Sequence, residues 1–309
     1  MSRDVAFCLA MVIAWRALPG AAQTGESTGK GGTLTGTVLA RRYKERETLA
    51  YHMSATNQGR VSTIRYEADA RGVVTKNAAG RFLEAFEWSG LKLNGEAVTL
   101  PAGNGSFQQN LSLDPEVPPT MPDFSRVDPR LIGPCADLLT FYADLWLVLR
   151  TGTLAKAGDH LYVKNGTPNS WADGHTTLLG QDSIDFDITL GEVNARAGTA
   201  TVIVRHLPPA EPQIKMPTQW MQEPVADTSN NWVEVSKTGS EDHPYLGEVG
   251  KETFEVKITV SLADGKILSA TMDNPVEAIA RECEDAELTK CGKAERYRIR
   301  RQIEVRLGQ

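Results

Sequence analysis

The sequence predicts a mainly β protein of the α+β class. We expect a curved antiparallel sheet or half-open β-barrel wrapped on one long apolar helix, plus a short C-terminal helix. Two observations carry this prediction. Apolar residues alternate one by one over several long stretches, which is typical of strands with one buried face. One stretch, 136–150, has helical spacing instead, and no helix recurs between strands as parallel crossovers would require.

The first 22 residues have the composition of a secretory signal peptide. Arg3 precedes an apolar run from Val5 to Trp15, and Pro19 and small residues lead to Ala22, after which we expect cleavage. The apolar run is shorter than the ~20 residues that a membrane span needs. We therefore expect an exported protein, periplasmic or extracellular, with no transmembrane segment in the mature chain.

The charge of the chain is mildly acidic. Cleavage would remove two cations and one anion, so the formal net charge would change from −6 to −7. Nucleic-acid binding requires a clustered basic surface, which such a chain is not expected to have. We therefore expect no nucleic-acid partner.

Beyond the signal peptide we expect a flexible tether over 23–44 and a single β-rich domain over 45–309. The tether is small and polar and has no periodicity. Two stretches interrupt the domain, a proline-rich insert over 101–134 and a long loop over 208–250.

Residues 47–100 have the two-residue period of a strand meander. Tyr66 and Ala68 alternate with charged residues, and Phe86 and Trp88 share one apolar face. Turn signals such as Asn94-Gly95 separate the runs. We therefore expect antiparallel strands with one buried face.

The apolar helix follows the proline-rich insert, and Gly152 is expected to end it. Its stripe at positions i, i+3, i+4, i+7, i+8 and i+11 consists of Leu138, Phe141, Tyr142, Leu145, Trp146 and Leu149. The stripe either packs as core or lines a cavity. In the second case, the residues expected to bind an apolar ligand are Phe141, Tyr142, Leu145, Trp146 and Leu149, with Phe86 and Trp88 of the meander.

The C-terminal part has the clearest pattern. Residues 254–262 alternate, Asp264-Gly265 forms a hairpin turn, and the chain returns as a strand. Pro275 predicts a short helix over 274–282, because proline is favoured at the first helical position. Arg301 interrupts the apolar face of the last strand, over 297–307. Its side chain either reaches solvent or binds a buried carboxylate or an anionic ligand.

Three cysteines remain after the expected cleavage. Cys283 and Cys291 are close in sequence, so in an oxidising compartment we expect them to form a disulfide. Cys135 is left over and is expected to be a buried thiol, whose role the sequence leaves open.

No sequence motif indicates catalysis, a metal or a cofactor. The five histidines form no zinc-binding spacing. The most site-like stretch, 159–187, contains Asp159, His160, Ser170, Asp173, His175 and Asp182. These residues either serve the backbone of a polar turn region or form a hydrolase or metal site.

The order of elements resembles the periplasmic lipoprotein-carrier and lipoprotein-sorting half-barrel superfamily, and related uncharacterised bacterial envelope proteins. The resemblance covers 45–307 and rests on the meander, the helix ADLLTFYADLWLVLR, the strand AGDHLYV and the hairpin FEVKITVSLADGKILSATM. It implies a curved antiparallel sheet that holds acyl chains in its hollow.

The sequence leaves three alternative functions open. The first is an exported, non-enzymatic envelope protein that binds an apolar or lipid-like ligand between sheet and helix. The second is a structural or interaction module with a filled core and an envelope protein as partner. The third is a hydrolase or metal site in 159–187. The volume between helix and sheet distinguishes the first two.

Overall fold

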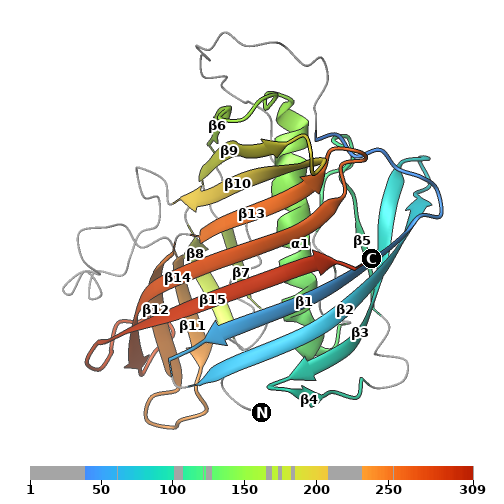
Figure 1. Ribbon diagram of the computed structural model, residues 1–309. Helices are drawn as coiled ribbons and strands as arrows, with labels where there is room; N and C mark the ends of the chain where they lie inside the picture. Colours follow the sequence, from blue (N-terminus) through green and yellow to red (C-terminus); the bar gives the residue numbers. More distant parts are fainter. Residues whose placement is uncertain are drawn as a thin grey trace.

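A computed structural model shows one large antiparallel sheet that curls around a central helix, α1 (Pro129–Thr151) (Figure 1). This confirms the predicted fold class. The predicted signal peptide lies outside the described residues. The structure describes residues 39–60, 62–100, 107–120, 122, 127–164, 169–172, 176–181, 185–207, 232–252 and 254–308.

The sheet has 15 strands in these described ranges, and every pairing between them is antiparallel. The strands are β1 (Thr48–Gln58), β2 (Thr63–Lys76), β3 (Phe82–Leu93), β4 (Glu96–Ala97), β5 (Gln108–Leu111), β6 (His160–Val163), β7 (Asn169–Ala172), β8 (Thr176–Gln181), β9 (Asp185–Asn194), β10 (Thr199–Leu207), β11 (Trp232–Lys237), β12 (Tyr245–Glu252), β13 (Phe254–Ser261), β14 (Ile267–Cys283) and β15 (Glu295–Leu307).

The sheet branches at β14. One side of β14 pairs with β15, which continues through β1 and β2 to β3. On its other side, the first half of β14 pairs with β13 and the second half with β12. The β13 branch continues through β10 and β9 to β6, and the β12 branch through β11 and β8 to β7. The β13 branch and the β1–β3 meander contribute most of the core around α1.

Helix α1 begins at Pro129, seven residues before the predicted start. The Asp128 side chain accepts the Arg130 N–H at 3.0 Å, and Pro129 occupies the first turn, where its missing N–H has no helical acceptor. Pro134 lies inside the helix. Within the proline-rich insert over 101–134, regular structure is thus present in β5 and in the first residues of α1. Gly152 ends the helix in the left-handed region, with φ of 64°.

Helix α1 is buried on all sides rather than along one stripe. Thr140 is the only residue from Leu131 to Leu149 that is not fully buried, and even Asp137 and Asp144 are inside. By length and composition α1 could cross a membrane, which corrects our expectation that no later segment is apolar enough. However, 94% of its apolar window is buried within the protein, as in the core helix of a soluble fold.

The predicted short helix over 274–282 is wrong, because these residues continue β14. Pro275 lies where the pairing with β13 has ended and that with β12 has not begun, so its missing N–H removes no ladder bond there. Val276, Ile279, Ala280 and Cys283 have helical spacing because this part of β14 is buried on both faces. The prediction was wrong because it relied on Pro275, which β14 tolerates between its two pairing partners.

Residues 39–47, here called the strap, pack against the sheet, so the expected tether does not extend to residue 44. Leu39 is fully buried, and Arg42 donates hydrogen bonds to the Leu262 and Ala263 carbonyls in the β13–β14 turn. Gly265 has φ of 71°, and a Cβ atom there would lie 2.5 Å from the Ala40 carbonyl oxygen. The turn and the strap therefore require glycine at this position.

The β12 branch has a small core of its own. The predicted loop over 208–250 contains β11 and β12, so it is not irregular throughout. Val235, Val249 and Ile279 pack with Leu288 and the predicted disulfide, which forms between Cys283 and Cys291. Cys135 is a free, buried thiol, as expected, and burial raises its pKa.

Candidate functional site between helix and sheet

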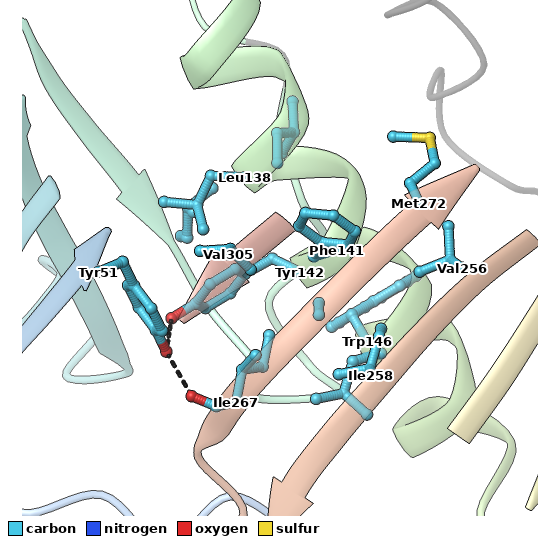
Figure 2. Packing of buried hydrophobic residues seen from close by; sticks show 14 of the residues in the cluster. Tyr51, Leu138, Phe141, Tyr142, Trp146, Val256, Ile258, Ile267, Met272 and Val305 are labelled. Atoms are coloured by element: carbon cyan, nitrogen blue, oxygen red, sulfur yellow. Dashed lines mark hydrogen bonds between the residues drawn. The ribbon is translucent and has the colours of Figure 1, made fainter. Parts of the chain in front are cut away.

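The structure brings the predicted ligand-binding side chains together in the interior between α1 and the sheet. The Phe86 and Tyr142 rings lie edge to face at 5.9 Å, and Figure 2 shows Phe141, Tyr142 and Trp146 pointing from α1 towards the strands. The exposed fractions are 0% for Phe141, Leu145 and Phe86, 1% for Tyr142, 2% for Trp88, 3% for Trp146 and 5% for Leu149.

The low exposed fractions indicate that the interior beside the stripe is filled. A side chain that lined a hollow wide enough for one water molecule would present accessible surface to it. The stripe presents almost none, so the space beside it is filled by protein atoms. The polar atoms of the two tryptophans are also occupied, because Trp146 donates to the Asp114 carbonyl and Trp88 to Gln109.

Tyr142 belongs to a buried hydrogen-bond network. Its hydroxyl donates to the Glu84 carboxylate of β3 and lies 3.3 Å from the Tyr51 hydroxyl, which donates to the Ile267 carbonyl (Figure 2). Arg41 of the strap binds Glu84 at 2.9 Å. Burial raises the pKa of Glu84, and Arg41 offsets part of that rise. The network therefore joins the strap, β3, β1 and α1 around one carboxylate.

A second buried carboxylate, Asp137, holds the first half of α1. Arg301 of β15 and Tyr66 of β2 each donate to one of its oxygens. Arg301 is 6% exposed, so of the two alternatives for this residue the structure shows the buried carboxylate. Burial raises the pKa of Asp137, and the Arg301 charge opposes that rise.

A third buried carboxylate, Asp144, holds the second half of α1. Its Oδ2 atom lies 2.9 Å from Nε2 of His206 on β10. The exposed fractions of the two side chains are 0% and 2%. Burial raises the pKa of Asp144, and His206 offsets part of the rise.

The β12 branch carries a fourth buried acidic group, which the sequence did not indicate. Glu248 lies directly opposite Glu234 of β11, and both are buried. Tyr297 donates to Glu248. Burial raises the pKa of Glu248, and the Tyr297 hydrogen bond offsets part of the rise. Buried acidic groups of this kind could be predicted from a charged residue at a position of a strand that otherwise carries apolar, inward-facing residues. This pattern did identify Arg301.

The stretch 159–187 is described only in part. Asp159 accepts the N–H groups of Ala155 and Lys156, which is a backbone role, and His160 pairs with Asp187 on the surface. Ser170, Asp173, His175 and Asp182, the other members of the imagined hydrolase or metal site, have no described side chains. Within the described ranges, no three His, Cys, Asp or Glu residues gather as a metal site would require.

Two depressions lie outside the interior. One, of about 240 Å³, is at the end of the β12 branch, where Arg60, His243 and Lys293 line it with Glu282 and Glu295. The other, of about 510 Å³, lies on the outer face of the sheet and is here called the outer depression. Its lining consists of Ser54, Ala55, Thr56, Glu255, Lys257, Thr271, Met272, Asp273, Gln302, Ile303 and Glu304.

Comparison with known proteins adds no family to this description. No model of a protein family matches the chain, and no curated protein matches it.

Proposed function

We propose that this protein is an exported, non-enzymatic interaction protein with a filled core, and that it contacts a partner protein through the outer face of its sheet. The observation that carries the proposal is the filled interior. The seven side chains expected to hold an apolar ligand are at most 5% exposed, whereas a ligand site is a preformed cleft or cavity.

The buried carboxylates support a structural role rather than catalysis. Glu84 and Asp137 are each bound by an arginine and a tyrosine, and Asp144 by a histidine. A catalytic acid or base has to come within hydrogen-bond reach of a substrate. These three are fully buried and each is bound by other side chains of the protein, so their effect is to hold α1 and the strap in place.

The outer depression has the chemistry of a polar contact surface. Its outward side chains form two neighbouring cross-strand rows, Ser54–Glu304–Thr271–Lys257 and Thr56–Gln302–Asp273–Glu255. The acids have cationic neighbours, as Arg300 binds Asp273 and Arg205 binds Glu255. The hydroxyl groups of Ser54, Thr56 and Thr271 are therefore the groups that can bind a partner. They suit a polar segment of a protein better than an acyl chain.

Export is part of the proposal. The Cys283–Cys291 disulfide supports it, because disulfides persist in oxidising compartments. N-terminal sequencing of the protein from its cells should give Gln23 as the first residue. Met1 as the first residue would contradict cleavage of a signal peptide.

The first experiment tests the filled core against the apolar-ligand hypothesis. Native mass spectrometry of the purified protein should show the mass of the chain alone, and a fluorescent fatty acid should show no saturable binding. The proposal is wrong if the wild type binds the probe, Leu145→Ala loses that binding, and Val73→Ala on the outer face of β2 keeps it.

The second experiment tests the contact surface. A photo-crosslinking residue at Thr271, in the outer depression, should give one discrete adduct with a protein in the cells that make this chain. The same residue at exposed Thr75, near the end of β2, should not. No adduct at Thr271, or equal adducts at both positions, would contradict the proposal.

A further inference from the structure

The part of the chain that the structure describes contains three His–Asp pairs in very different surroundings. His52–Asp69 and His160–Asp187 lie at the surface, where both histidine side chains are more than half exposed. The third pair, His206–Asp144, is inside the protein, with exposed fractions of 2% and 0%. The chain thus supplies two surface controls for one buried pair.

The buried pair joins α1 to the sheet through aromatic surroundings. The His206 ring stacks on Phe254 of β13 at 3.7 Å between centroids and meets the edge of Phe186 of β9 at 4.8 Å. Among the described residues, His206 Nδ1 and Asp144 Oδ1 are buried without a hydrogen-bond partner. The Nε2–Oδ2 contact is thus the polar link between the second half of α1 and this branch.

The charges around the buried pair do not replace either partner. Arg205, beside His206 in β10, lies on the outer face and pairs with Glu255 and Asp187. Asp185 of β9 accepts the Tyr162 hydroxyl. These neighbours lie across the sheet, whereas His206 contacts Asp144 directly, with Nε2 and Oδ2 2.9 Å apart.

The end of α1 adds a cation, but that cation faces solvent. Arg150 is exposed, and its guanidinium lies 5.2 Å from the centre of the Trp146 ring. The other two buried carboxylates of the interior, Asp137 and Glu84, are bound by arginines, which stay charged at all ordinary pH. Asp144 is therefore the one of the three whose cationic partner can lose its charge.

We propose that Asp144 and His206 form a pH-sensitive clamp, which holds one proton between them and fixes the second half of α1 to β9, β10 and β13. With one proton the pair is either an ion pair or two neutral groups, and both are tolerated in a buried site. Without that proton the carboxylate would keep a charge that only a neutral imidazole N–H faces, and with a second proton the imidazolium would have no counter-charge.

Counting protons gives the direction of the effect. In the unfolded chain an imidazole loses its proton near about pH 6.5 and an aspartate near about pH 3.9. Between these values the unfolded groups hold one proton together, as the clamp does, so the clamp adds no pH dependence. Above about pH 6.5 the unfolded groups hold none, so each further pH unit favours unfolding about tenfold until the clamp itself deprotonates.

The test is a comparison of urea unfolding from pH 5 to 9. Asp144→Asn with His206→Gln keeps a neutral hydrogen-bonded pair that does not titrate. The ratio of the unfolding constants of wild type and this double variant should be flat up to about pH 6 and then rise about tenfold per pH unit. The matched surface control is Asp69→Asn with His52→Gln. The ratio of the unfolding constants of wild type and this control should stay nearly constant over the pH range, because both side chains are solvated. A ratio that stays flat to pH 9 would overturn the proposal.

A further measurement uses the wild type, so the proposal stays testable if the double variant does not fold. After correction for intrinsic rates, amide exchange should rise above pH 7 over 144–151 more than over 131–135, which the Asp137–Arg301 pair holds. Equal exchange in both halves of α1 would show that no clamp exists.

Discussion

At the scale of single residues, the interior is organised by charged side chains that a hydrophobic pattern does not reveal. Asp137 and Glu84 each lie between a guanidinium and a tyrosine hydroxyl, and in both cases the two partners come from segments far apart in sequence. A buried charge is stable only with such partners. These contacts therefore fix both the rotation and the height of α1 within the sheet.

The Asp137 pair gives a prediction at this scale. Arg301→Met should lower the free energy of unfolding by about 3–5 kcal/mol, because it leaves a buried carboxylate without its cation. Urea unfolding measures the loss, and adding Asp137→Asn should recover most of it.

The control for this prediction lies one residue away. Arg300 points to the outer face and pairs with Asp273, and both side chains are about half exposed. Arg300→Met should therefore cost about 1 kcal/mol or less. Similar losses for the Arg300 and Arg301 variants would mean that burial does not decide the strength of these pairs.

At the scale of elements, β14 connects the two branches of the sheet. It pairs with β15 from Ser269 to Ala280, and in two halves with β13 and β12. Its last residue, Cys283, bonds to Cys291, and this disulfide closes the small core of the β12 branch. The small core of the β12 branch is therefore held by a disulfide, whereas the main core is built around α1.

The disulfide gives the prediction for this scale. Replacing Cys283 and Cys291 by alanine should lower the free energy of unfolding by about 2.5 kcal/mol, since the short ring restricts the unfolded chain. Amide exchange should rise over 245–250 and stay unchanged within α1. A uniform rise over both regions would show that the disulfide supports the whole sheet rather than the β12 branch.

At the scale of the whole molecule, the strap links parts of the sheet that are far apart in sequence. The strap runs from buried Leu39 to Glu47, and it contacts the β13–β14 turn on one side and β3 on the other. Arg41 binds Glu84 and Glu47, and Lys266 also binds Glu47. Distant parts of the sheet thus meet through ion pairs of the strap.

The strap gives the last prediction. A chain that starts at Glu45 lacks Arg41 and should lose about 3–5 kcal/mol relative to a chain that starts at Gln23, because Glu84 is left without its cation. Thermal or urea unfolding measures the difference. Glu84→Gln in the shorter chain should recover part of the loss, and equal stability of the two chains would show that the strap is dispensable.

The sequence predicted what depends on local pattern. The two-residue alternation of 254–262 predicted a strand, and the helical spacing of 136–150 predicted the helix. The fold class followed from these patterns. The spacing of Cys283 and Cys291 likewise predicted the disulfide. The sequence also identified the stripe side chains that meet in the interior.

The tertiary structure decided what depends on partners distant in the chain. The stretch 274–282 is a strand because two neighbouring strands pair with it, although its spacing suits a helix. Arg301 points inward because it binds Asp137, which is 164 residues away in sequence. The stripe is part of the core because neighbouring atoms fill the space beside it. Burial and charge pairing arise from residues that only the folded chain brings together, so no local pattern contains them.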